Sequence, residues 1–138
     1  MRVLVDTSVW ADFLNAHVSP QATALAALLR GEDDVCTCGI VVAEVFQGLR
    51  RDAGRDYLAS LFREMTFLEA PGIDLHFRAA EIYRTLRRRG QTIRSTIDCL
   101  IAVTAERHEC AVLARDRDLT AIMRSGLVAV APWPVARR

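Results

Sequence analysis

The stretch MRVLVDTSVW (residues 1–10) decides the fold, because a short apolar strand there runs directly into an acid and the start of a helix. Val3, Leu4 and Val5 are typical of a buried strand, and Thr7 and Ser8 begin the expected helix. Asp6 therefore stands at the C-terminal end of a strand. Open parallel α/β sheets bind their ligands beyond that end of the strands, so Asp6 is a candidate functional residue.

Strands and helices alternate along the rest of the chain. We predict strands at 2–6, near 34–37, near 66–69, at 110–114 and near 127–130, and helices near 7–16, 20–30, 40–51, 54–65, 73–89, 95–107 and at 117–124. Short apolar strands between helices favour an α/β fold with a central, mostly parallel sheet of four to five strands, covered on both faces. The tail Pro132-Trp133-Pro134 is expected to pack irregularly, because proline cannot continue a strand ladder.

The composition predicts one globular domain over residues 1–138, because 138 residues of 51% hydrophobic content suffice for one core and not for two. No apolar run reaches the ~18 residues of a membrane span, and no signal peptide is visible, so we expect a cytoplasmic protein with no membrane partner. The cysteines lie in apolar segments, where we expect them to be buried and free; they are Cys36, Cys38, Cys99 and Cys110.

Charge narrows the classes of function. The formal net charge is only +1, so any contact with nucleic acid must be local rather than a bulk attraction. All 18 basic residues are arginine, and the absence of lysine argues against a Walker-type phosphate loop. Phospho-acceptor receiver domains and phosphatases of the haloacid-dehalogenase type also use a lysine beside their acids, and the second type needs another aspartate where Thr7-Ser8 stand.

Four acids lie in apolar segments: Asp6, Glu44, Asp98 and Asp116. Each aspartate alone could cap a helix or form a surface ion pair, as Asp98 could with Arg94. Glu44 lies on a mostly apolar helix face, where only a nearby cation would offset its desolvation. An all-oxygen set suits Mg²⁺ or Mn²⁺, and such ions support phosphodiester hydrolysis. Asp118 is a further ligand or a supporting acid.

Four motifs together resemble the PIN-domain ribonucleases, and in length and motif order the chain is similar to the VapC-type toxins of bacterial toxin–antitoxin pairs. The motifs are VDTSVW (5–10), AEVFQGL (43–49), RSTIDCLIAVTA (94–105) and LARDRDLTAI (113–122). The resemblance implies a PIN-like three-layer α/β/α fold. It also implies a metal-dependent endoribonuclease that cleaves cellular RNA, often transfer or ribosomal RNA, and so stops translation.

Carried over by position, the resemblance assigns metal ligation and catalysis to Asp6, Glu44, Asp98 and Asp116, a frequent additional acid to Asp118, and a supporting hydroxyl to Thr7 or Ser8. It further implies a homodimer and a cognate antitoxin. Two apolar stripes fit such contacts or simple core packing: Tyr57, Leu58, Leu61, Phe62 and Met65 on one helix, and Trp10, Phe13 and Leu14 on another.

Arginines near the acids could hold RNA phosphates, or could merely be solvated at a helix end; we single out Arg87, Arg88, Arg94 and Arg117. Two other functions stay open. A PIN-like module could bind RNA or a protein without cutting, and a 5′-nuclease acting on DNA would share an acidic cleft. The second needs more acids and DNA-gripping elements than this chain has room for.

Overall fold

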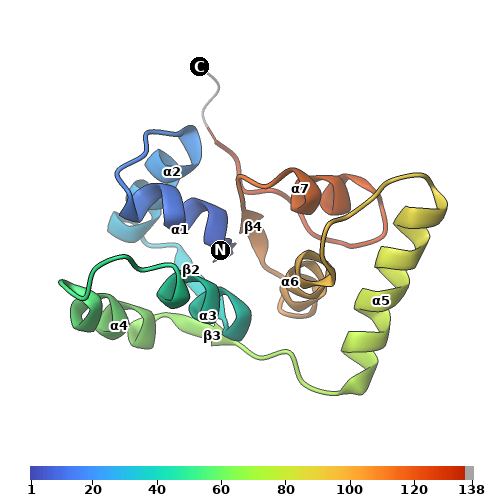
Figure 1. Ribbon diagram of the computed structural model, residues 1–138, viewed down its shortest axis with the longest axis horizontal. Helices are drawn as coiled ribbons and strands as arrows, with labels where there is room; N and C mark the ends of the chain where they lie inside the picture. Colours follow the sequence, from blue (N-terminus) through green and yellow to red (C-terminus); the bar gives the residue numbers. More distant parts are fainter. Residues whose placement is uncertain (136–138) are drawn as a thin grey trace.

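Four short parallel strands form the centre of the molecule in the computed structural model, which describes residues 1–135 (Figure 1). The strands are β1 (Arg2–Val5), β2 (Asp34–Cys38), β3 (Thr66–Leu68) and β4 (Ala111–Leu113). The helices are α1 (Thr7–Leu14), α2 (Pro20–Arg30), α3 (Gly39–Gln47), α4 (Arg55–Glu64), α5 (Ile73–Arg88), α6 (Thr96–Arg107) and α7 (Arg117–Arg124). The predicted α/β fold, with its parallel sheet between helices, is confirmed.

The strand order is β3-β2-β1-β4, so the chain moves outward from β1 on one side and returns to its other side with β4. In the register, Leu4 of β1 lies between Cys36 of β2 and Val112 of β4. Strand order therefore reverses at β1 and β4. In open α/β sheets such a reversal leaves a crevice at the carboxyl ends of the strands, which is where Asp6 and Asp116 follow β1 and β4.

Helices α1 to α4 lie on one side of the sheet, and α5 to α7 lie on the other (Figure 1). On the first side, Trp10 of α1 lies 4.8 Å from Phe62 of α4 between ring centroids, and Phe62 contacts Phe46 of α3 at 5.4 Å. Trp10, Leu58 and Phe62 are buried, so this part of the predicted apolar stripes is core. Tyr57, in contrast, is 79% exposed.

The predicted strand near 127–130 is wrong. Its Val128 and Val130 are buried in the core, but the backbone there bonds to side chains instead of a neighbouring strand: Ala129 N–H donates to Glu106, and the Leu127 carbonyl accepts from Arg78. The chain reaches the sheet only later, in a single parallel bridge between Val112 and Pro132. Hydrogen bonds of 3.0 and 2.8 Å from Val112 N–H to the Ala131 carbonyl and from Trp133 N–H to the Val112 carbonyl hold it, so the tail is more ordered than predicted.

Most predicted element boundaries lie within a few residues of the observed ones, and the largest difference is at α3. We predicted this helix to residue 51, but it ends at Gln47, with Gly48 as its C-cap. All four cysteines are buried and free, as expected. Within residues 1–135, none of the helices combines the length and the apolar character needed to cross a bilayer.

Candidate metal centre

Asp6 is buried at the junction of β1 and α1, where it is the N-cap of α1. One carboxylate oxygen accepts hydrogen bonds from the Ser8 hydroxyl at 2.6 Å and from Ser8 N–H at 3.1 Å. Burial raises the pKa of Asp6, and the hydrogen bonds from Ser8 partly offset this effect. The Ser8 hydroxyl also accepts from Arg115 N–H at 3.0 Å, so one side chain joins the ends of β1 and β4.

Glu44 lies on α3 and points toward the same junction. Its carboxylate accepts a 3.0 Å hydrogen bond from the Thr7 hydroxyl, the residue that follows Asp6. Burial raises the pKa of the Cys38 thiol, and the nearby charges of Asp6 and Glu44 raise it further. The two acids therefore act on the same buried thiol, although they are distant in sequence.

Asp98 is in the first turn of α6, which Ser95 caps by accepting from Ile97 N–H. Partial burial raises the pKa of Asp98 from 3.8 to about 7, and the charges of Asp116, Asp6, Asp118 and Glu44 add to the rise. All four other candidate acids thus lie within electrostatic reach of Asp98. The charges of the other four acids that the sequence singled out thus act on this one carboxylate.

Asp116 and Asp118 complete the cluster at the start of α7. Asp116 is the N-cap of α7, and one of its oxygens accepts from Leu119 N–H at 2.9 Å. One carboxylate oxygen from each of Asp98, Asp116 and Asp118 lies within 4.8 Å of the others. Asp118 is the most deeply buried of the three.

Arg94 contacts this cluster in a way that the sequence did not predict. Its Nε donates to Asp118 at 2.8 Å, its backbone N–H donates to the same oxygen at 3.1 Å, and its terminal nitrogen donates to Asp116 at 3.1 Å. The hydrogen bond from Arg94 lowers the pKa of Asp118. We considered an ion pair between Arg94 and Asp98, but within residues 1–135 the ion pairs of Arg94 are with Asp116 and Asp118.

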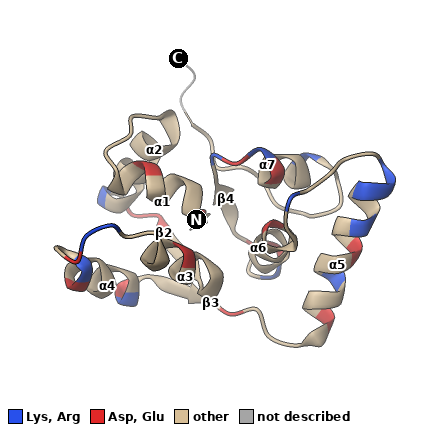
Figure 2. Ribbon diagram, viewed as in Figure 1, with Lys and Arg blue, Asp and Glu red and all other residues tan. Residues whose placement is uncertain are grey.

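The other arginines that the sequence singled out are Arg87 and Arg88 of α5 and Arg117 of α7. Figure 2 shows basic residues at the C-terminal end of α5, where the loop that leads to α6 begins. The Arg87 guanidinium lies 5.7 Å from the centre of the Tyr83 ring, and Arg88 donates to the Thr85 hydroxyl at 3.2 Å. Arg117 is exposed beside Asp116 and Asp118 at the first position of α7. None of these residues is bonded to the acids as Arg94 is, within the part of the chain that the structure describes.

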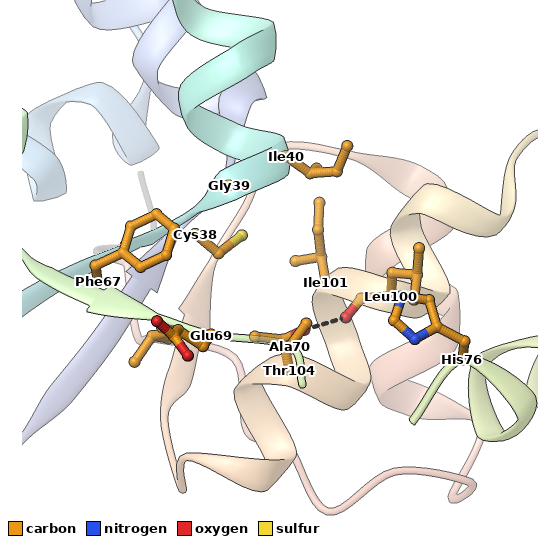
Figure 3. Close-up of a pocket in the computed structure, with 11 residues that line it drawn as sticks. Cys38, Gly39, Ile40, Phe67, Glu69, Ala70, His76, Leu100, Ile101 and Thr104 are labelled. Carbon is orange, nitrogen blue, oxygen red and sulfur yellow. Dashed lines mark hydrogen bonds between the residues drawn. The ribbon is translucent and has the colours of Figure 1, made fainter. Parts of the chain in front are cut away.

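An apolar pocket of about 270 Å³ lies near the acids but does not contain them (Figure 3). It is lined from α3 by Ile40, one turn before Glu44, and from α6 by Leu100, two residues after Asp98. The polar side chains in its wall are bonded locally: Thr104 donates to the Leu100 carbonyl, and His76 bonds the Gly72 carbonyl. Glu69 is the one carboxylate among the lining residues, so the pocket lacks the cluster of acids that holds a divalent ion for phosphodiester chemistry.

The donor set of the acidic cluster fits a hard divalent cation. All of its side chains offer carboxylate oxygens, which Mg²⁺ and Mn²⁺ prefer over the nitrogen and sulfur ligands typical of zinc. Burial and the repulsion of neighbouring acids raise the pKa of Asp98, and a bound cation relieves both effects. Asp6 and Asp116 are the N-caps of α1 and α7, at the carboxyl ends of β1 and β4, and Asp98 lies in α6. A bound ion would therefore also join these elements.

Comparisons with known proteins found similar sequences and similar folds. The PIN domain model matches residues 3–124. Ribonuclease VapC11 of Mycobacterium tuberculosis is 36% identical over 124 residues, which are 88% of this chain and 92% of that protein. The crystal structure of VapBC2 from Rickettsia felis, bound to a DNA fragment from its promoter, has a TM-score of 0.67 at 18% identity and covers 97% of this chain and 100% of that one. VapC20 of M. tuberculosis, a Sarcin-Ricin loop cleaving toxin, has a TM-score of 0.58 at 24% identity and covers 94% and 99%.

Proposed function

The chain belongs to the PIN-domain family of VapC-type ribonucleases, and from this premise we propose that it is an Mg²⁺- or Mn²⁺-dependent endoribonuclease that acts as the toxin of a toxin–antitoxin pair. Its substrate is cellular RNA, transfer or ribosomal, and cleavage would stop translation. One observation carries the proposal: carboxylate oxygens of Asp98, Asp116 and Asp118 lie within 4.8 Å of one another, and the charges of Asp6 and Glu44 also act on Asp98. A protein without a cation at this place would gain nothing from such crowding.

We assign the metal ligands to Asp6, Asp98 and Asp116, with Glu44 completing the set directly or through water. A hard divalent ion supplies a water of lowered pKa and neutralises charge on the phosphate. The chain's own hydroxyls orient the ligands: Ser8 fixes one oxygen of Asp6, and Thr7 fixes one oxygen of Glu44. Each acid then keeps its other oxygen for the ion.

The test is expression of the chain beside its Asp6→Ala variant, with a map of newly cut RNA ends. We expect growth arrest and defined cuts from the wild type, and neither from Asp6→Ala, because this variant lacks a ligand at the centre of the cluster. Asp56→Ala, which removes an exposed acid of α4, is the matched control and should arrest growth. Equal cutting by the wild type and Asp6→Ala would contradict the proposal.

The main alternative is a PIN-like module that binds RNA or a partner protein without cutting it. The complete set of acids speaks against this alternative. A titration of purified protein with Mg²⁺ or Mn²⁺ in an RNA cleavage assay separates the two functions, since a binding module would retain RNA at every metal concentration without producing fragments.

We propose that Arg87, Arg88 and Arg117 hold RNA phosphates beside the centre. Arg87→Ala or Arg88→Ala is expected to weaken RNA binding and to reduce the slope of log affinity against log salt by about 1, because each removes about one phosphate contact. Metal affinity should not change. Arg63→Ala, which removes a cation from the last turn of α4, is the control for net charge. Salt slopes that equal the wild-type slope in both variants would remove these residues from the RNA surface.

A cognate antitoxin and a second copy of the chain are the proposed protein partners. Solved complexes of similar fold include VapBC toxin–antitoxin assemblies. Exposed apolar side chains are available for such contacts at two places: Phe13, Leu14 and Tyr57 on α1 and α4, and Phe67, Ile73 and Phe77 around β3 and the start of α5. Burying exposed apolar side chains is a common basis of protein association.

A further inference from the structure

Arg94 is fixed in place more firmly than an exposed arginine usually is. Its side chain is 68% exposed, yet three hydrogen bonds tie the residue to Asp116 and Asp118, one of them from its backbone N–H. Ile93 before it is buried, and Ser95 after it caps α6. The backbone that carries the guanidinium is therefore held in place, and the Arg94 side chain has already lost much of its conformational entropy in contacting the acids.

Asp118 forms a close ion pair with Arg94, so its charge is already compensated by a cation of the chain itself. Its side chain is only 4% exposed, and one of its oxygens accepts both the Nε and the backbone N–H of Arg94. A buried carboxylate needs such a partner, because an unpaired one would carry the full cost of desolvation. The charge of Asp118 is thus already compensated by Arg94 in the protein without metal, and a cation at Asp118 would have to compete with the guanidinium.

Asp116 differs, because its bonds are spread over both oxygens. One oxygen accepts from Arg94 and the other from Leu119 N–H. A carboxylate oxygen has two lone pairs, so each oxygen of Asp116 can still bind a second partner. Asp116 is therefore shared between Arg94 on one side and the remaining acids, Asp6 and Asp98, on the other.

We propose that the Arg94 guanidinium takes the place of a second metal ion in the acidic centre. The chain then binds a single divalent ion at Asp6, Asp98 and Asp116, while Asp118 is a positioning residue that holds Arg94. This inference rests on the proposed function only in that it requires a divalent ion at the acidic centre. Five carboxylates could bind one ion or two, and the position of Arg94 between Asp116 and Asp118 favours one.

The experiment counts Mn²⁺ bound per chain, by electron paramagnetic resonance of free Mn²⁺ and by calorimetry, without RNA. We expect one ion for the wild type and two for Arg94→Gln, because loss of the guanidinium frees Asp118 and one side of Asp116. The double variant Arg94→Gln/Asp118→Asn should return to one ion, since the second site needs Asp118. Arg117→Gln removes the neighbouring positive charge without removing these bonds, and should keep one ion.

A further variant keeps the test decisive if Arg94→Gln does not fold. Asp118→Asn, with Arg94 intact, should still bind one Mn²⁺ with an affinity within about threefold of wild type. An affinity loss of tenfold or more would make Asp118 a ligand and overturn the inference. So would two ions in the wild type, or a single ion in a folded Arg94→Gln. A wild type that binds no Mn²⁺ would instead overturn the metal centre of the proposed function.

Discussion

Replacing Asp98 with Asn is expected to lower RNA cleavage by about 10³-fold or more while making the metal-free protein more stable. The loss of activity follows because Asp98 lies at the centre of the acids that we assign to the ion, and Asn replaces its charged ligand with a neutral amide. The gain in stability follows because the same change removes a charge that burial desolvates and that the neighbouring acids repel. The two effects have one cause and opposite signs.

The size of the stability gain can be bounded. The pKa of Asp98 rises from 3.8 to about 7, and one pKa unit corresponds to about 1.4 kcal/mol. Because Asp98 is only partly buried and solvent screens part of the repulsion, we discount the full value to about 1–2 kcal/mol. That is an increase in melting temperature on the order of 5 °C, measured at pH 8 in the presence of a chelator.

Asp74→Asn is the matched control. Asp74 is also an aspartate in the first turn of a helix, α5, but it is exposed. Its replacement should leave cleavage unchanged and should not raise the melting temperature, because an exposed acid near a helix N-terminus is favourable. Wild-type cleavage rates in Asp98→Asn would rule out Asp98 as a ligand, and a lower melting temperature would show that the acids do not repel one another.

Much of the fold and the acidic cluster could be predicted because the signals are local. Val3 to Val5 followed by Asp6, and the apolar strand before Asp116, place two acids at strand ends without any knowledge of the rest of the chain. Parallel pairing of β1 with β4 then brings these ends together. The sequence could not establish that pairing by itself, although the alternation of strands and helices favoured a parallel sheet.

Arg94 shows why the rest could not be predicted. Its spacing of four residues from Asp98 suggests a helical ion pair, but Ser95 between them is the N-cap of α6, so Arg94 lies outside the helix. Its real partners are more than 20 residues away in sequence. The strand predicted near 127–130 is wrong for a similar reason. Its apolar pattern reflects burial of Val128 and Val130, while its backbone groups form hydrogen bonds with Arg78 and Glu106 from distant helices.

Stability without metal and activity with metal are expected to change in opposite directions with pH. Between pH 3.8 and about 7, the folded protein holds a proton on Asp98 that the unfolded chain has released. The folded state therefore binds more protons than the unfolded state in this window, and stability falls as the pH rises through it. Asp6, whose pKa is also raised by burial, contributes with the same sign.

The metal-free protein should therefore melt at a lower temperature at pH 8 than at pH 6. Cleavage at a fixed, limiting Mg²⁺ concentration should instead rise about fivefold between pH 6 and pH 7 and level off near pH 8, because ligation requires the deprotonated carboxylate. Saturating Mg²⁺ should also raise the melting temperature more at pH 8 than at pH 6, since at pH 6 the ion must displace a proton.

The Asp98→Asn variant separates the contribution of Asp98 to this pH dependence from the contributions of the other titrating groups, because the variant retains all the others. Its metal-free melting temperature should vary less between pH 6 and pH 8 than that of the wild type, and the difference between the two profiles belongs to Asp98. Identical profiles would mean that Asp98 does not titrate in this range. Burial and the neighbouring acids would then not raise its pKa into this range, and the argument that the acids share a divalent ion would lose its electrostatic basis.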